Sequence, residues 1–334
     1  MKIFLPFKSQ ATGGSLTFAT KFKAGMERRG HEVFFDFRDN YDVVLLIAQG
    51  PFPYLLHAKR NKKPIVQRFD AVPYWSVASW KFPLLNAKAT YARYLFVDFT
   101  VYQSQYSKYC VEKVIGKKPF ERATIIHNGV DLQLFSPNGL KRNLRDHPRQ
   151  KIFLTAEDFR RKEQIVPIIQ AFEIYKKKYG ENCKLLVAGS FRGEAANVPH
   201  EYQDVPDLVF LGRVKNHELP SYERAADIFL HTHLNPACPN NVIEAMACGL
   251  PICGVADGSM PELVEVGSNG LLVPTSGDAF WRRRSIDVRA FADNMHKIIT
   301  HQEQHSKESR RVAEDRFSLD DMIEKYEKVL KELV

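Results

Sequence analysis

Apolar residues along this chain follow two alternating patterns: short β-rich runs and longer segments that carry one apolar stripe. In the first part, β-rich runs predict strands at 2–7, 33–37, 43–48, 64–67 and 99–103. Within 15–29, Phe18 and Phe22 recur on one helical face, and Gly30 follows where a glycine commonly ends a helix. Alternation of this kind predicts a parallel sheet covered by helices.

The same alternation starts again near Lys151. Further β-rich runs predict strands at 152–155, 184–188, 209–211, 228–232 and 252–255. Apolar stripes predict helices at 164–179, 219–226 and 241–248. Between the two halves, the stretch 138–150 is polar and basic and holds Gly139 and Pro148, as a linker does.

Two such halves predict an α/β fold of two doubly wound, Rossmann-like domains that face a central cleft. We place the first domain at 1–143 and the second at 144–316. An amphipathic C-terminal helix at 317–334 either packs locally or crosses back to the first domain. Ligands of open parallel sheets bind outside the carboxyl ends of the strands, so we expect the functional site at those ends.

The composition is that of an ordinary globular chain, with 334 residues of which 44% are hydrophobic. This length is sufficient for two domains, each with its own hydrophobic core. We find no apolar run long enough to cross a bilayer, and residues 1–6 resemble one short strand rather than a secretion signal. Five cysteines without a C-x-x-C pair favour a reducing compartment. We therefore expect a cytoplasmic protein.

The net charge of +9 is unevenly distributed along the chain. Residues 1–140 hold 20 Lys and Arg against 10 Asp and Glu, whereas 141–334 hold 28 against 29. A solvated basic face is the common interpretation of scattered lysines. The alternative is contact with an anionic partner, either a phospholipid surface or a phosphate-bearing acceptor. We expect a protein that is cytoplasmic or peripheral to a membrane, without a nucleic-acid partner.

A short helix is predicted directly after the strand at 228–232. It would begin at Asn240, Asn241 and Val242, and Gly249 and Pro251 would end it. The free N–H groups at its start favour an anion such as a diphosphate. Glu244, one turn further, can accept hydrogen bonds from two neighbouring ribose hydroxyls. The alternative is a capped helix whose early glutamate merely favours the helix dipole.

Two further glycine-containing turns follow predicted strands. Gly258, Ser259 and Met260 open a second predicted helix, whose N-terminus would strengthen an anion site at adjacent strand ends. Gly13 and Gly14 follow the first strand and would let the backbone approach a sugar diphosphate closely. A plain flexible turn is the alternative at Gly13 and Gly14.

In this order, these motifs resemble glycosyltransferase family 4. The matching segments are Glu244 with residues 245–251, Pro261-Glu262, residues 125–131, residues 210–214 and residues 270–274. The resemblance implies the GT-B fold and a retaining hexosyltransferase that needs no metal. Such an enzyme moves a sugar from a UDP- or GDP-sugar to a hydroxyl of a glycan or lipid-linked acceptor. His231 and His233 share one strand face but lack a third partner in the sequence, so we expect no metal site.

The resemblance also places an arginine and a lysine on the donor phosphates. Arg160, Arg161 and Lys162 follow the first strand of the second half, and we assign Arg160 and Lys162 catalytic roles and Arg161 donor binding. The register is open, because Ala156-Glu157 stands where a Gly-Arg pair is usual. A solvated charge cluster is the alternative.

Two positions depart from the family pattern. Pro236 occupies the place of the glutamate that addresses the transferred sugar, so Asn235, Asn240 or Asn241 would have to contribute. After the fourth strand there is no histidine, and Arg68 and Asp70 occupy that region. Asp70 would serve as a base or polar contact for the acceptor hydroxyl, or the two residues would form a structural ion pair.

An aromatic run at 72–94 contains Tyr74 and Trp75, which we place on the acceptor side. The run would line an acceptor groove, dip into a membrane surface or be buried packing.

Three functions therefore remain in consideration. A nucleotide-sugar-dependent glycosyltransferase is the leading hypothesis. A sugar-nucleotide epimerase or hydrolase of the same fold is the second. A degenerate nucleotide-sugar-binding protein without turnover is the third, and Pro236 favours it.

Overall fold

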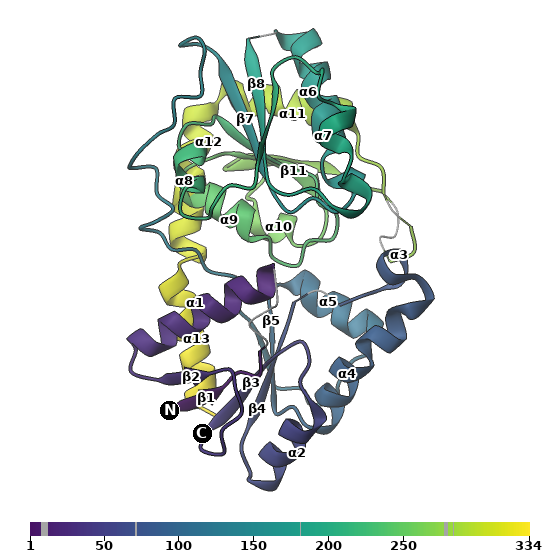
Figure 1. The fold of residues 1–334 in the computed structure, drawn as a ribbon, viewed down its shortest axis with the longest axis vertical. Coiled ribbons are helices and arrows are strands. Elements are labelled where there is room, and N and C mark those ends of the chain that lie inside the picture. Colours follow the sequence, from purple (N-terminus) through teal and green to yellow (C-terminus); the bar gives the residue numbers. More distant parts are fainter. Residues whose placement is uncertain (8–12, 71, 181, 277–279, 283) are drawn as a thin grey trace. The chain divides into compact units, whose positions relative to one another are not determined.

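The computed structural model describes residues 1–7, 13–70, 72–180, 182–276, 280–282 and 284–334 (Figure 1). The chain forms two compact units. The first contains Met1–Gly129, the described part of Asp278–Arg283, and Leu319–Val334. The second contains the described parts of Val130–Gly277 and Arg284–Ser318.

The first unit is built on a six-stranded parallel sheet in the order β2-β1-β3-β4-β5-β6. Its strands are β1 (Lys2–Phe4), β2 (Glu32–Phe34), β3 (Val43–Ile47), β4 (Ile65–Phe69), β5 (Phe99–Tyr102) and β6 (Ala123–Ile125). Its helices are α1 (Gly14–Arg28), α2 (Phe52–Arg60), α3 (Trp75–Ala78), η1 (Ser79–Lys81), α4 (Phe82–Leu95), α5 (Gln105–Val114) and α13 (Leu319–Lys331).

Helix α13 packs on α1 in the first unit. The ring of Tyr326 lies 5.3 Å from that of Phe18 and 5.5 Å from that of Phe22, measured between centroids. Gly25 allows this close approach, because a Cβ built on it would lie 2.5 Å from a side-chain carbon of Ile323. The C-terminal helix therefore completes the hydrophobic core on one face of the first sheet.

The second unit is built on another six-stranded parallel sheet, in the order β12-β11-β10-β7-β8-β9. Its strands are β7 (Lys151–Ala156), β8 (Cys183–Ala188), β9 (Leu208–Gly212), β10 (Ile228–His231), β11 (Ile252–Ala256) and β12 (Gly270–Pro274). Its helices are η2 (Lys162–Gln164), α6 (Val166–Tyr179), η3 (Gly193–Ala195), α7 (Val198–Glu201), α8 (Leu219–Glu223), α9 (Asn240–Ala247), α10 (Met260–Leu263), α11 (Val288–Thr300) and α12 (Gln302–Arg316).

In both sheets the direction of winding reverses once. The reversal lies between β1 and β3 in the first sheet and between β7 and β10 in the second. Loops diverge to opposite faces at such a reversal and leave a crevice at the carboxyl ends of the two strands, where ligands of these folds bind. The second sheet has the strand order of dinucleotide-binding Rossmann folds.

The predicted α/β fold with two doubly wound sheets is confirmed. The segment 138–150, predicted as a linker, is hydrogen-bonded to the second unit. The Arg145 guanidinium makes two bonds to the Asp227 carboxylate, at 2.8 and 3.1 Å, and Arg142 donates to the Ser221 hydroxyl at 3.3 Å. Asp227 directly precedes β10, so these hydrogen bonds attach the segment to the start of that strand.

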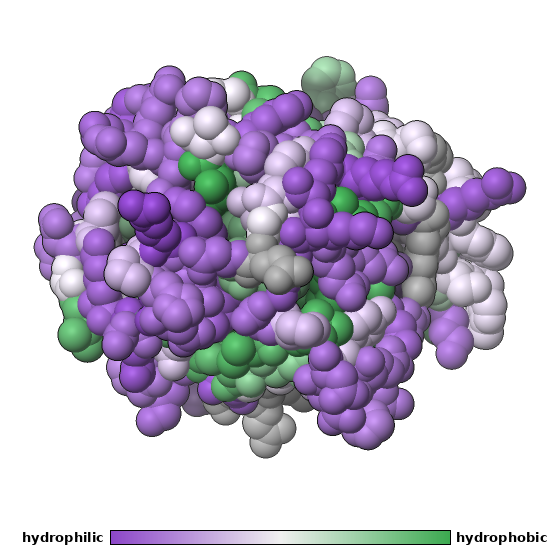
Figure 2. All heavy atoms as spheres, turned by 90° about the horizontal axis from the view of Figure 1, so that it is seen from above, coloured by the Kyte–Doolittle hydropathy of each residue, from purple (hydrophilic) through white to green (hydrophobic). Residues whose placement is uncertain are grey.

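Among the helices of the described ranges, none is both long enough and apolar enough to cross a membrane. Hydrophilic residues cover most of the face shown in Figure 2, with small hydrophobic areas between them.

Candidate functional site

The start of helix α9 is fixed to the end of strand β7. The Asn241 side-chain amide donates a hydrogen bond to the Ala156 carbonyl at 2.8 Å. Strands β7 and β10 are neighbours in the sheet, and α9 follows β10. The predicted donor-binding residues Asn240, Asn241 and Val242 therefore begin a helix at the reversal point of the second sheet.

Gln164 organises the loop that follows β7. Its side-chain oxygen accepts from the backbone N–H groups of Arg160 and Arg161, at 2.8 and 2.9 Å. Its amide donates to the Glu157 carboxylate at 2.7 Å, and its carbonyl accepts from the Thr232 hydroxyl at 2.8 Å. The sequence pattern does not reveal this role of Gln164, because a glutamine at the start of a helix carries no distinctive signal.

The three predicted phosphate-binding cations each have a different acidic partner. Arg160 pairs with Asp158 at 3.1 Å, Arg161 with Glu163 at 3.4 Å, and Lys162 with Glu201 at 2.7 Å. The side chains of Arg160 and Lys162 are about half exposed, at 57% and 49%. Exposed pairs of this kind contribute only about 0–1 kcal/mol, so an anionic ligand can replace the partners at low cost.

Asp158, the partner of Arg160, accepts hydrogen bonds from several donors. Burial would raise the pKa of its carboxyl, but hydrogen bonds from Arg192, Ser190 and Arg160 lower that pKa to about 2. Asp158 is therefore ionised at neutral pH and holds Arg160 and Arg192 beside the loop after β7.

A cluster of Glu157, His231 and His233 lies at the carboxyl ends of β7 and β10. The His233 ring donates from Nδ1 to the Glu157 carboxylate, and one ligand atom from each of the three residues lies within 4.8 Å of the others. The expectation that His231 and His233 lack a third partner was wrong. Glu157 supplies it because β7 and β10 are adjacent, although the two residues of the ion pair are 76 positions apart.

The pKa values of the two histidines of this cluster are shifted in opposite directions. His231 is only 1% exposed, and burial lowers its pKa to about 4, so its ring is neutral at pH 7. Burial also lowers the pKa of His233, but the Glu157 carboxylate raises it, and the net shift is upward. The cluster therefore holds one neutral imidazole, that of His231, beside the hydrogen-bonded pair of Glu157 and His233.

Glu244 is buried on α9, and a second buried carboxyl lies near it on α8. Glu223 is fully buried, and burial, followed by the repulsion of the Glu244 carboxylate, raises the pKa of Glu223 to about 8. Glu223 is thus protonated at neutral pH beside Glu244. The sequence pattern does not mark Glu223 as a site residue, because a glutamate within a predicted helix is usually on the helix surface.

The turn after β11 is fixed by Pro236. Gly258 has a φ of +58°, and a Cβ on it would lie 2.3 Å from the Pro236 ring. The Ser259 N–H donates to the Pro236 carbonyl at 2.8 Å. The following helix, α10, is only four residues long, so its N-terminus is a weaker anion site than the sequence predicted.

Several buried polar atoms of the second unit have no hydrogen-bond partner among the described residues. They include both ring nitrogens of His231, both carboxyl oxygens of Glu223, Oδ2 of Asp257, Oγ of Ser259 and Nε of Arg284. Leaving one such group unpaired costs about 1–3 kcal/mol. His231 ends β10, and Asp257 and Ser259 follow β11, so these atoms mark a polar site at neighbouring strand ends.

In the first unit, Arg68 and Asp70 form an ion pair with each other. Asp70 also accepts from the Ser15 hydroxyl at 2.8 Å and from the Gln103 amide. Arg68 is 1% exposed, donates to the Asn128 side chain at 2.9 Å and stacks on the ring of Phe18 at 3.7 Å. The structural ion pair that the sequence left open is present, and the contact of Asp70 with an acceptor stays a prediction.

The backbone conformation at position 13 favours glycine. Its φ of +88° suits glycine, and it precedes α1, whose first residue is Gly14. No heavy atom of the described residues lies within 4 Å of a Cβ built on either glycine. Their close approach to a ligand therefore stays a prediction.

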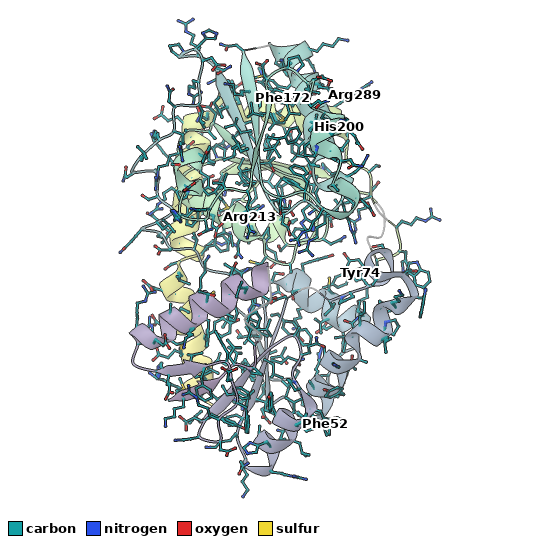
Figure 3. All side chains as sticks on the ribbon, viewed as in Figure 1. Phe52, Tyr74, Phe172, His200, Arg213 and Arg289 are labelled. Atoms are coloured by element: carbon teal, nitrogen blue, oxygen red, sulfur yellow. The ribbon has the colours of Figure 1, made fainter. Side chains whose placement is uncertain are left out.

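The two aromatic residues predicted on the acceptor side differ in exposure. Tyr74, labelled in Figure 3, is 5% exposed. Its ring lies 4.8 Å from that of Phe280, measured between centroids. Trp75 is 43% exposed, and its ring lies 6.0 Å from that of Trp281. Tyr74 is thus core packing of the first unit, whereas Trp75 is accessible.

Two doubly wound, six-stranded units with a polar site at the reversal point of the second are the architecture of the GT-B class. This chain belongs to the family of glycosyl transferases group 1, whose model matches residues 140–314, more than half of the chain.

Solved structures of low identity share the fold over nearly the whole chain. Sucrose-phosphate synthase from Thermosynechococcus elongatus is 16% identical with a TM-score of 0.79, and the match covers 99% of this chain and 98% of that one. HepE from Anabaena, in complex with UDP-glucose, is 16% identical with a TM-score of 0.73, and the match covers 99% and 100%.

Curated relatives are similar over shorter stretches. D-inositol 3-phosphate glycosyltransferase from Mycobacteroides abscessus is 30% identical over 175 residues, which are 48% of this chain and 37% of that protein. N-acetyl-alpha-D-glucosaminyl L-malate synthase from Bacillus anthracis is 22% identical over 221 residues, 64% of this chain and 54% of that protein. The match with this chain thus spans about half or less of the length of these relatives.

Proposed function

We propose that this protein is a retaining glycosyltransferase that moves a sugar from a UDP- or GDP-sugar to a hydroxyl of a glycan or lipid-linked acceptor. The observation that carries the proposal is the start of α9. Asn241 holds it on the end of β7, at the reversal point of the sheet, with buried Glu244 one turn further. The structural neighbour HepE was solved in complex with UDP-glucose, which supports a uridine donor.

In this proposal the first N–H groups of α9 bind the donor diphosphate, and Glu244 accepts hydrogen bonds from the ribose hydroxyls. Arg160 and Lys162 exchange their exposed partners for phosphate oxygens and stabilise the charge that develops on the leaving diphosphate. No step of the transfer is assigned to a metal. With Pro236 packed on Gly258, the sugar contacts would come from neighbours such as Asn235 or Asn240.

The test is a panel of UDP- and GDP-hexoses, each incubated with and without hydroxyl acceptors, with release of the nucleoside diphosphate and the anomeric configuration of the product measured. Acceptor-dependent release with retention supports the proposal. Release that does not need an acceptor would favour a hydrolase, and conversion of the donor without release an epimerase. Donor binding without either reaction would contradict the transferase and favour a binding protein.

Glu244→Gln tests the nucleotide contact within the same proposal. Loss of charge-assisted hydrogen bonds to ribose should weaken UDP or GDP binding by about 10- to 100-fold in calorimetric titration. Glu173→Gln, an exposed residue on α6, is the matched control and should bind as the wild type does. Equal affinity in the Glu244 and Glu173 variants would reject the ribose role.

We also propose that the first unit contacts an anionic membrane surface from the cytoplasmic side. Trp80, Leu84 and Leu85 of η1 and α4 are 69%, 75% and 53% exposed. Lys81 and Lys88 are exposed on the same two helices. Aromatic and aliphatic side chains beside lysines are the composition of interfacial helices. The five cysteines are all buried and free, which supports a reducing compartment.

A further inference from the structure

The Glu157–His231–His233 cluster contains a buried imidazole, that of His231, to which no described residue is hydrogen-bonded. His231 is 1% exposed, and neither of its ring nitrogens has a hydrogen-bond partner among the described residues. Buried polar groups are almost always paired with protein, water or a bound species. The same ring lies in a group whose three ligand atoms are within 4.8 Å of one another. The unpaired ring therefore points to a ligand.

The spacing of the cluster is close to that of a metal centre. Three atoms bound tetrahedrally to one Zn²⁺, at about 2.0–2.2 Å each, lie about 3.4 Å apart. The ligand atoms of the cluster lie within 4.8 Å of one another. Rotation of the side chains that carry them would shorten these distances to about 3.4 Å when a metal ion binds. His231 ends β10 and His233 follows two positions later, and their rings lie side by side, 6.2 Å apart between centroids and 25° from parallel.

The supporting contacts are already in place. Gln164 donates to the Glu157 carboxylate at 2.7 Å and is itself held by the backbone of Arg160 and Arg161. Outer hydrogen bonds of this kind orient metal ligands and raise their affinity. Gln164 also accepts from Thr232, the residue between the two histidines, so it connects both ligand-bearing segments.

We propose that Glu157, His231 and His233 bind one divalent transition-metal ion. Two imidazole nitrogens and one carboxylate oxygen suit zinc and its neighbours in the first transition row. Three protein ligands leave one coordination position open, and His233, 42% exposed, brings that position within reach of solvent. The binding does not depend on the proposed transfer, in which no step uses a metal.

The charges around the cluster are balanced. Arg161 lies close enough to His233 to repel a cation, and Glu163, which pairs with Arg161 at 3.4 Å, offsets that repulsion. A metal ion bound through Nδ1 of His233 would displace the proton between this nitrogen and the Glu157 carboxylate, because a ligand nitrogen must be unprotonated.

The experiment is a calorimetric titration of the chelator-treated, full-length protein with zinc chloride at pH 7.5, without any nucleotide. One ion per chain should bind. His233→Ala and Glu157→Gln should each weaken binding by at least about 10-fold, because loss of a ligand costs no less than loss of an outer-shell partner. Cobalt(II) should give the intense visible absorption of a four-coordinate site, and both variants should lose it.

His200→Ala is the matched control, since His200 is exposed at α7 (Figure 3). It should bind zinc as the wild type does. His231→Leu removes the buried ligand, and thermal unfolding without metal shows whether that variant is folded. Absence of zinc binding by the wild type, or unchanged affinity in either His233→Ala or Glu157→Gln, overturns the proposal. These outcomes are separate from the transferase assay, because no donor is present.

Discussion

The pair of buried carboxyl groups, Glu223 and Glu244, illustrates how single residues depend on their surroundings. Glu244 lies on α9 and Glu223 on α8. Only the burial of Glu223 and its closeness to Glu244 raise its pKa to about 8. One of the two carboxyls is thereby kept neutral at pH 7, which spares the core a second buried negative charge.

Glu223 should make stability depend on pH. Between its unfolded pKa of about 4.5 and its folded pKa of about 8, the folded state binds more protons than the unfolded state. The free energy of unfolding should therefore fall as pH rises through this window, by an amount on the order of a few kcal/mol. In Glu223→Gln this loss should disappear, and the variant should be more stable than the wild type at pH 8.

Chemical denaturation of both proteins at pH 5 and pH 8 checks this prediction. Glu173→Gln is the control for replacing an exposed glutamate. A wild type and a Glu223 variant with the same dependence on pH would show that the Glu223 carboxyl is not responsible.

At the scale of elements, the turn between β11 and α10 depends on one glycine. Gly258 adopts a left-handed conformation and leaves room for Pro236, which itself stands where the family pattern has a glutamate. The proline at position 236 and the geometry of this turn therefore depend on each other, because Pro236 contacts Gly258 directly.

Gly258→Ala should destabilise the second unit by more than a left-handed backbone alone explains. That conformation costs a non-glycine residue about 1–2 kcal/mol, and the new Cβ would also lie 2.3–2.6 Å from Pro236 atoms. Gly212→Ala is a matched control, since Gly212 has a φ of +66° and no described heavy atom within 4 Å of its Cβ position. Urea denaturation of both variants measures the difference, and equal losses would refute a role for the Pro236 contact.

Element packing also explains the C-terminal helix. Met322, Ile323, Tyr326 and Leu330 of α13 are buried in the first unit. The amphipathic pattern of the sequence predicts such a helix but does not name the surface that receives it. Gly25 on α1 provides that surface, because it leaves space for the Ile323 side chain.

At the scale of the whole molecule, positive charge is concentrated in residues 1–140. The exposed Leu84 and Leu85 belong to this same part of the chain. Apolar insertion and charge attraction would therefore act together on an anionic surface.

We expect the protein to bind vesicles that contain phosphatidylserine more strongly than vesicles of phosphatidylcholine alone. Binding should weaken from low salt to 1 M salt, where the screening length falls to about 3 Å. Leu84→Glu combined with Leu85→Glu should weaken it further. Leu140→Glu, at a position 76% exposed in the second unit, is the control. Co-sedimentation measures each case, and binding that responds to neither salt nor the Leu84 and Leu85 changes would contradict a membrane role.

Local sequence patterns by themselves determined the two sheets and the motifs on them. The alternation of strands and helices, the breaks at glycine and proline, and the short helix carrying Glu244 all follow from which face of each element is buried. The structure moves strand ends by one or a few residues. It adds β6 (Ala123–Ile125), and it shows that Gly270–Pro274, which only the family resemblance marked, forms β12.

Only the tertiary structure decided which side chains meet. The Glu157–His233 contact joins residues 76 positions apart, and it exists because β10 lies beside β7 rather than beside β9. The Arg68–Asp70 network, Gln164 and the neutral Glu223 likewise depend on strand order and burial. Hydrophobic periodicity records the side of an element that faces the core, but it carries no information on which strand lies next to it.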